Sequence, residues 1–156
     1  TYTLDFKAGA QTTILAQDVP LSQIPSQGYG VAVSTIGITN PFIPVTIDIK
    51  PGSFPSTINL GSNGVIPTTI FGSATFDVHQ IIATSTTLAN ASIKPKGNGQ
   101  PQVTLSDVNG DGFTDLTVHF LTDALQLTSS SVKATVNGFL LNGQGFKGSD
   151  SVVVVP

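Results

Sequence analysis

The sequence predicts an all-β fold, an antiparallel β-sandwich, on three observations. Short runs alternate apolar with polar residues, which is the pattern of strands that have one buried face. Clusters of Gly, Pro, Asn and Ser separate these runs about every ten residues. Thr and Val, which favour strands, are frequent within them. Many short strands at this spacing indicate a sandwich of the immunoglobulin-like or jelly-roll-like kind.

The first expected strand covers residues 2–7 and has an apolar residue at every second position, namely Tyr2, Leu4 and Phe6. A connector containing several Gly and Pro residues follows, and extended patterns resume at residues 31–33 and 35–39. Two arrangements fit residues 1–43. In one, the segment packs on its own sandwich. In the other, the first strand inserts into an open sheet edge of a neighbouring copy. The second arrangement makes Tyr2, Leu4 and Phe6 assembly residues of a head-to-tail homopolymer, because such contacts do not close on themselves.

Residues 44–156 are expected to form the sandwich itself. Its first strand, at residues 45–50, alternates Val and Ile with polar residues until Pro51 and Gly52 end it. Residues 77–89 contain one expected strand but also fit a short helix. The further strands are expected at residues 65–71, 81–88, 91–94, 102–105, 116–121, 132–136, 138–141 and 151–155.

The segment Asp107–Asp115, between two of these strands, has the spacing of a calcium loop. Oxygen-bearing side chains stand at alternate positions, Gly112 follows the third of them where the chain must turn sharply, and a carboxylate closes the loop. Ca²⁺ takes six to eight oxygen ligands, and one of these is expected to be a backbone carbonyl. The alternative is an ordinary turn rich in Asp, Asn and Gly. The predicted ligands are Asp107, Asn109, Asp111, the carbonyl of Phe113, and Asp115.

This loop is not of the EF-hand type, because its twelfth position is Val118 rather than Glu and because strands flank it. It resembles the calcium-binding hairpin loops of integrin-type propeller repeats and, more distantly, the dockerin loop.

A longer resemblance covers residues 45–156. The run from Ile47 to Asn59 reads IDIKPGSFPSTIN, and the loop with its following residue reads DVNGDGFTDL. Together these are similar to a module that recurs in secreted bacterial proteins, with the signatures IDIKPGSFPNSIN and DVNGDGxxDL. Ser56 and Thr57 stand where that pattern more often has Asn and Ser. The resemblance implies an extracellular calcium-binding module placed beside adhesion or repeat domains, and it implies no catalytic residue.

Composition agrees with an exported protein. The chain has no Cys and no Met, and it begins at Thr1, so we expect a processed chain or a fragment outside the cell or on its surface, after removal of a signal peptide. A net charge of −3 with six scattered Lys and no Arg argues against nucleic acid as a partner. No apolar stretch approaches the ~20 residues that span a bilayer, so no membrane insertion is expected.

The sequence predicts no enzyme and no catalytic residue, since the nucleophile elbow, HExxH, phosphate-loop and dinucleotide motifs are all missing. The expected function is that of an extracellular structural protein, a calcium-stabilised subunit of a surface fibre or matrix. The alternative is a carbohydrate-binding or adhesive module of a larger secreted protein, with glycans as partners. Asn90-Ala-Ser92 is a sequon, so Asn90 is a candidate glycosylation site.

Overall fold

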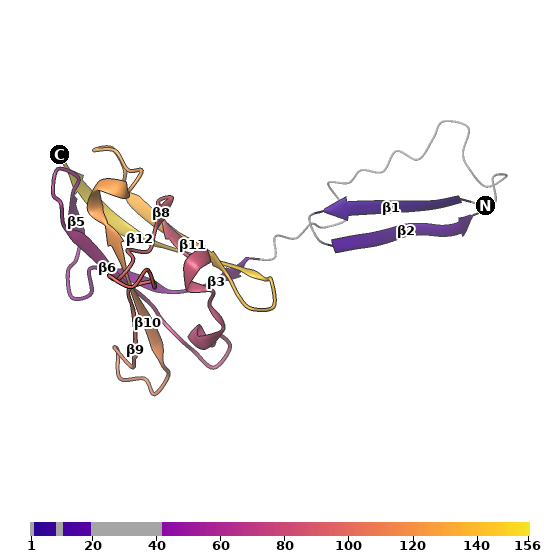
Figure 1. Ribbon diagram of the computed structural model, residues 1–156, viewed down its shortest axis with the longest axis horizontal. Helices are drawn as coiled ribbons and strands as arrows, with labels where there is room; N and C mark the ends of the chain where they lie inside the picture. The colour runs from indigo at the N-terminus through magenta and orange to yellow at the C-terminus, as the bar shows by residue number, and fades with distance from the viewer. Residues whose placement is uncertain (1, 9–10, 20–41) are drawn as a thin grey trace. The chain divides into compact units, whose positions relative to one another are not determined.

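The computed structural model describes the backbone of residues 2–8 and 11–19 and all atoms of residues 42–156 (Figure 1). The chain divides into two compact units, Thr1–Asn40 and Pro41–Pro156. No helix in the described part of the chain is long and apolar enough to cross a membrane.

The first unit contains a two-stranded antiparallel sheet made of β1 (Tyr2–Ala8) and β2 (Gln11–Val19). The register runs from Ala8 opposite Gln11 to Tyr2 opposite Val19. The predicted first strand is therefore confirmed. The prediction of a connector directly after it is wrong for residues 11–19, which form β2. The extended patterns expected at residues 31–33 and 35–39 lie outside the described residues.

The second unit is an antiparallel-dominated β-sandwich, as the alternation of residues predicts. Three short 3₁₀ helices interrupt its strands: η2 (Val78–Gln80), η3 (Ala83–Ser85) and η4 (Thr122–Ala124). In chain order the strands are β3 (Ile43–Pro44), β4 (Ile47–Ile49), β5 (Ser56–Asn59), β6 (Val65–Ile70), β7 (Thr87–Leu88), β8 (Ala91–Ser92), β9 (Val103–Ser106), β10 (Asp115–Leu121), β11 (Lys133–Phe139) and β12 (Gly145–Val155).

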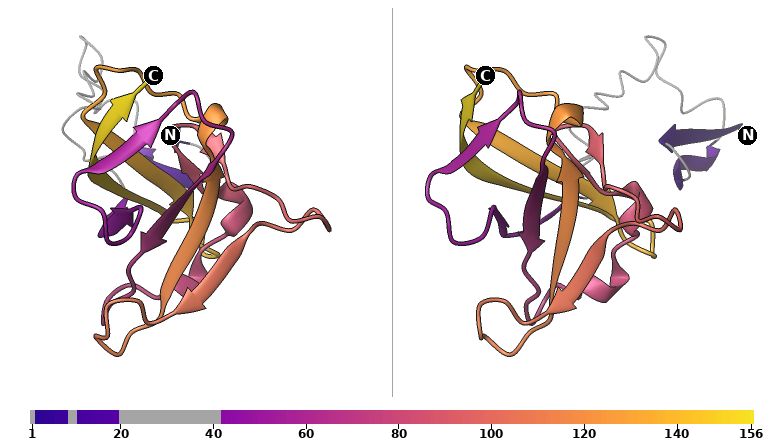
Figure 2. Two further views of the ribbon diagram at one scale, coloured as in Figure 1. Left: turned by 90° about the vertical axis from the view of Figure 1, so that its left-hand side faces the viewer. Right: turned by 60° about the vertical axis from the view of Figure 1, so that its left-hand side comes forward.

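One sheet has four strands in the order β4-β6-β10-β9, all antiparallel. Strand β10 lies at its centre, with Leu116 opposite both Ile70 of β6 and Leu105 of β9. The other sheet has the order β3-β12-β11-β7-β8, and β5 also pairs with β12. Both β3 and β5 run parallel to β12, at its two ends. Figure 2 shows β5 beside the C-terminal end of β12.

The core lies between the two sheets because each strand turns alternate apolar residues inward. Val118 and Phe120 of β10 are fully buried, and so is Phe146 of β12. The Phe146 ring lies over Gly138, where a Cβ atom would come within 2.6 Å of it, and it contacts the Phe76 ring at a centroid distance of 5.8 Å. The tight approach at Gly138 explains why this strand position carries no side chain.

The two sheets are joined along one side by the chain from β3 to β5. The Val45 amide donates to the Lys147 carbonyl (2.9 Å), and the Ile49 amide donates to Asp150 Oδ2 (2.9 Å). Ser56 Oγ donates to the Ile49 carbonyl. Strands β4 and β12 belong to different sheets. The Asp150 side chain of β12 therefore accepts the β4 hydrogen bond that a backbone carbonyl of a neighbouring strand would otherwise accept.

Several element predictions need correction. Residues 81–88 do not form one strand, because η3 and the two-residue β7 occupy this stretch. The alternative of one short helix for residues 77–89 is also wrong, since η2 and η3 are separate 3₁₀ turns. Two expected strands at 132–136 and 138–141 are one strand, β11. Strand β12 begins six residues before the expected Ser151, and β5 was not predicted.

Candidate metal centre

The segment Asp107–Asp115 connects β9 to β10 and projects from one end of the sandwich (Figures 1 and 2). Ser106 lies opposite Asp115 in the register of the two strands, so the loop begins and ends at one point of the sheet. Gly110 and Gly112 have φ angles of +77° and +87°, in the left-handed region that favours glycine. The predicted position of the loop between two antiparallel strands is confirmed.

The first carboxylate of the loop organises the turn. Asp107 Oδ1 accepts from the amides of Gly110 (2.7 Å) and Asp111 (3.2 Å), and its Oδ2 accepts from the amide of Gly112 (2.9 Å). Three successive amides therefore point toward one carboxylate, which fixes the curl of the chain. The side chain itself is exposed to solvent.

The next two polar side chains continue this pattern. Asn109 Oδ1 accepts from the Asp111 amide (3.1 Å), and Asn109 Nδ2 donates to Asp111 Oδ2 (2.9 Å). Asp111 Oδ1 accepts from the amide of Phe113 (2.9 Å). A carboxylate or amide oxygen that accepts one hydrogen bond keeps a second lone pair, which a cation can use.

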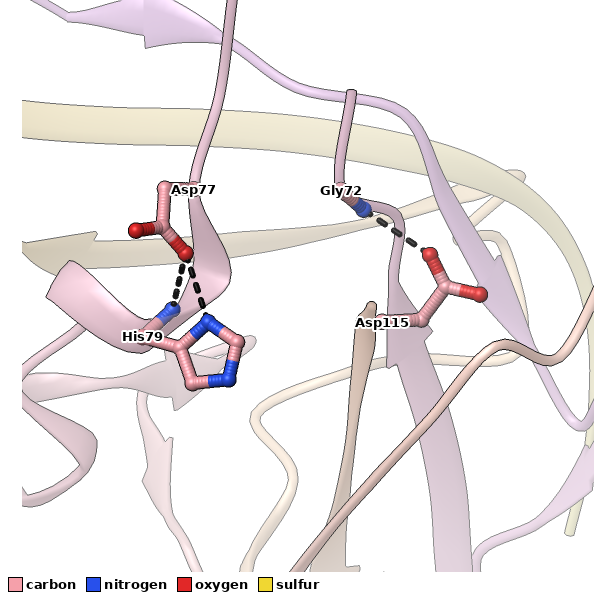
Figure 3. Close-up of polar contacts among 4 residues, drawn as sticks. All are labelled: Gly72, Asp77, His79 and Asp115. Atoms are coloured by element: carbon pink, nitrogen blue, oxygen red, sulfur yellow. Dashed lines mark hydrogen bonds and ion pairs between the residues drawn. The ribbon is translucent and has the colours of Figure 1, made fainter. Parts of the chain in front are cut away.

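Asp115 is the one loop carboxylate that is fully buried, and Figure 3 shows its contact with Gly72. Its Oδ1 accepts from the amide of Gly72 (2.9 Å), which follows β6, and its Oδ2 accepts from the amide of Val108 (2.8 Å). A Cβ atom on Gly72 would lie 2.1 Å from the Thr114 carbonyl oxygen, so only glycine allows this close approach. Asp115 therefore anchors the loop to the neighbouring strand.

The donor set fits Ca²⁺ in chemical type, because all its ligand atoms are oxygens and three of its side chains carry negative charge. The carboxylates are not gathered around one point: among the described residues, no three acidic or histidine side chains form a metal-binding group. Asp107, Asn109 and Asp111 are exposed, and each accepts hydrogen bonds from backbone amides of the loop, so gathering their oxygens around one ion requires these side chains to shift. Phe113 is 41% exposed, and its amide donates to Asp111 Oδ1.

A second pair of carboxylates lies in a different place. Asp48 and Asp150 line a cavity of about 360 Å³ together with Ile47, Gly52, Ser53 and Phe54. Burial, followed by the negative charge of Asp150, raises the pKa of the Asp48 carboxyl, and the Gly52 amide opposes this shift. Phe54 stands at this cavity with 90% of its surface exposed.

The Asp77 and His79 side chains form an exposed pair at η2 (Figure 3). Asp77 Oδ1 accepts from the His79 amide (3.0 Å) and lies 2.7 Å from His79 Nδ1. Both contacts lower the pKa of Asp77, the amide contact more than the ring contact. Asp77 is the N-cap of η2, so the contact between the two residues is explained by its structural role. Of residues 42–156, these two form the single ion pair.

The remaining predicted site residues are separate from the loop. Asn90 is exposed in the turn between β7 and β8, with φ of +66°, and its Nδ2 donates to Gln126 Oε1 (2.9 Å). The side chains of Tyr2, Leu4 and Phe6 lie outside the described residues; only the backbone of β1 is described. Sequence reasoning missed Gly72, and no local signal marks it, because it contacts Asp115 across 43 positions of the chain.

Comparison of the chain with models of known protein families and with curated proteins gives no match.

Proposed function

We propose that the protein is an extracellular structural subunit whose β-sandwich is stabilised by Ca²⁺ in the Asp107–Asp115 loop. The observation that supports the ion most directly is Asp115. Its carboxylate is fully buried, and among the described residues no Lys or His forms an ion pair with it. Burying a charge without a counter-charge is costly, and backbone amides offset only part of that cost. A divalent cation held by the loop supplies the missing positive charge.

The four polar side chains have defined roles in this proposal. Asp107, Asn109 and Asp111 provide exposed oxygens for the ion, and each is already oriented by backbone amides of the loop. Asp115 joins them from the sandwich side and keeps its contacts with Gly72 and Val108. The Phe113 carbonyl completes the set. The ion thus connects a solvent-exposed loop to a buried anchor.

The proposed role is assembly into a fibre or matrix through the N-terminal unit. This proposal draws on the strand pattern of residues 2–7 and on the presence of β1 in a unit of its own, in which it pairs only with β2 among the described residues. A two-stranded sheet is marginally stable in water, so it gains by adding to a further sheet. Each copy then carries one donor strand and one sandwich, and the contacts extend head to tail.

Negative-stain electron microscopy of the whole chain tests this role. We expect long fibres with a regular axial repeat in millimolar calcium, and folded monomers after deletion of residues 1–30. A matched sample with a calcium chelator shows whether assembly depends on the ion. Discrete particles of the whole chain in calcium, or polymers that persist after the deletion, would contradict the proposal.

Carbohydrate binding is the second candidate function, and one observation favours it. Phe54 is 90% exposed beside the cavity that contains Asp48 and Asp150. Sugar sites combine an exposed aromatic ring, which packs on the sugar face, with carboxylates that accept from hydroxyl groups. A volume of about 360 Å³ lies within the range of small-ligand pockets.

A glycan array, followed by titration of any hit, tests this second candidate. If the cavity binds sugar, Phe54→Ala weakens the affinity by about fivefold, since a stacked aromatic ring contributes on the order of 1 kcal/mol. Phe139→Ala is the matched control, because Phe139 is a half-exposed phenylalanine away from the cavity. An array without any saturable binding removes this candidate.

A further inference from the structure

Strand β9 is an unpaired edge of the sandwich unit. In the four-stranded sheet it pairs with β10 on one side, and no described strand pairs with its other side. The opposite edge of that sheet, β4, is closed by the hydrogen bond from Ile49 to Asp150. In the other sheet, β3 and β8 are only two residues long, and the Lys50 ammonium donates to the Thr57 carbonyl of β5 (2.8 Å).

The register shows which backbone groups of β9 face outward. The His119 amide donates to the Gln102 carbonyl (3.3 Å), so this carbonyl faces β10, while the Gln102 amide donates to the Lys94 carbonyl (2.8 Å). Hydrogen-bonded and non-hydrogen-bonded pairs alternate along antiparallel strands. Val103 and Leu105 therefore belong to non-hydrogen-bonded pairs with β10, and their amides and carbonyls point away from the sheet.

The β9 side chains that share a face with the buried residues of β10, Val103 and Leu105, are apolar. Leu105 lies opposite Leu116, which is 5% exposed, yet Leu105 itself is 48% exposed. The edge strand also lacks the charged residues and internal prolines with which proteins block strand addition. In the loop that follows it, two further large apolar residues are exposed, Val108 and Phe113.

We propose that the outer edge of β9 in one copy accepts strand β1 (Tyr2–Ala8) of a second copy. This inference rests on the proposed structural function and names the acceptor of the assembly contact. The sequences of the two strands match: Val103 and Leu105 alternate with Thr104 and Ser106, and residues 2–7 alternate apolar with polar residues in the same way. Strand addition joins two such strands through backbone hydrogen bonds, with apolar residues sharing one face.

The occupant is β1 of another copy because β1 belongs to a two-stranded sheet in a compact unit of its own. One side of β1 pairs with β2, and among the described residues no strand pairs with its other side. Addition to β9 makes β2, β1 and the four strands of the acceptor one continuous sheet. Six strands with an apolar face are stable where two are marginal.

Cysteine cross-linking tests this contact, because the native chain has no Cys. One variant carries Thr104→Cys, an exposed position of β9, and partner variants carry Thr3→Cys, Asp5→Cys or Lys7→Cys. Equal amounts of one β9 variant and one β1 variant are mixed and oxidised in millimolar calcium. We expect a disulfide-linked dimer that contains one chain of each kind, identified by intact mass. Thr57→Cys, an exposed position of β5, is the control acceptor.

A second experiment tests the outer edge of β9 with charge substitutions and without introduced cysteines. Leu105→Lys adds a charge to the proposed acceptor, and we expect it to reduce fibre formation at least tenfold. Leu141→Lys is the matched control, since Leu141 is 66% exposed and lies outside β9. Equal loss with both variants overturns the proposal.

The outcomes separate this inference from the function on which it rests. Cross-links between Thr104→Cys and a β1 position, absent with Thr57→Cys, support it. Cross-links of Thr104→Cys with itself, cross-links confined to one chain in a double variant, or no cross-link at all overturn it. Fibres without the β9 cross-link leave the structural function intact and place the acceptor elsewhere. The absence of both fibres and cross-links contradicts the proposed function as well.

Discussion

At the scale of single residues, the stability of the sandwich depends on carboxylates whose surroundings differ. Asp115 is buried between two backbone amides, and Asp150 supplies the acceptor that joins β4 to β12. Asp48 stands beside Asp150 with no cation paired to it among the described residues. Asp115 and Asp150 stabilise the fold by accepting hydrogen bonds, whereas the charge of Asp48 opposes folding.

The raised pKa of Asp48 gives a prediction with a definite sign. A carboxyl whose pKa is higher in the folded than in the unfolded chain binds its proton more tightly when folded. Its favourable contribution is complete below the ordinary value of 3.8 and is lost as the pH rises through the folded-state pKa. At neutral pH, the ionised group therefore lowers the free energy of unfolding.

We expect Asp48→Asn to raise the free energy of unfolding at pH 7 by a few tenths to about 1 kcal/mol, the range for partly exposed charge pairs. Well below pH 3.8 the difference from the native protein should vanish, because both side chains are then neutral. Urea unfolding at pH 7 and pH 3 measures this, with Asp123→Asn as the control, because Asp123 is an exposed acid outside the cavity. A variant that is less stable at pH 7 would show that the Asp48 charge is needed.

At the scale of secondary-structure elements, alternation of residues predicts the strands that have one face on the core. Strand β10 is the clearest case, since Val118 and Phe120 are buried and the intervening His119 is only half-buried. Alternation of apolar and polar residues in the sequence does not predict β2 or β5. Residues 11–19 contain consecutive polar and consecutive apolar positions, and β5 is only four residues long.

Residues 81–88 show a second limit of local patterns. Their apolar residues predict one strand, but the chain forms the 3₁₀ turn η3 and the two-residue strand β7 there. Some of the contacts that hold this conformation are local, since the Ser85 and Thr86 hydroxyls donate to the Ile82 carbonyl (2.7 and 3.3 Å). Another is not, because the Ile82 amide donates to the Phe139 carbonyl of β11 (2.9 Å). Contacts of the second kind depend on the fold and cannot be found in the local sequence.

The candidate site likewise has a part that depends on local sequence and a part that depends on the fold. The spacing of Asp107, Asn109 and Asp111 is local, so the sequence predicts the loop and its place between two strands. The contact of Asp115 with Gly72 depends on the register between β6 and β10, in which Leu116 lies opposite Ile70. A single sequence does not specify this register. The loop is therefore predictable, while its anchor is not.

At the scale of the whole molecule, the loop connects the open edge of the sandwich to its interior. Asp107 directly follows β9, the last residue of which is Ser106, and Asp115 begins β10. Through Gly72, Asp115 also reaches the end of β6. An ion bound in the loop therefore fixes three strands of one sheet at once, including the strand that we propose as the acceptor. Calcium binding and global stability are thus expected to be linked.

This linkage has a predictable size. If the loop is half-saturated at about 20 μM, then about 2 mM calcium adds roughly 2.7 kcal/mol to the free energy of unfolding. For a domain of this size, that corresponds to a rise in Tm on the order of 10 °C. Asp111→Ala removes one of the proposed ligand side chains from an exposed position, so it should lower the Tm by this amount in calcium and leave it nearly unchanged in chelator. Asp123→Ala, an exposed Asp outside the loop, should change neither value. Scanning calorimetry of the three proteins in both buffers makes the comparison, and equal shifts of Asp111→Ala in calcium and in chelator would mean that the loop holds no ion.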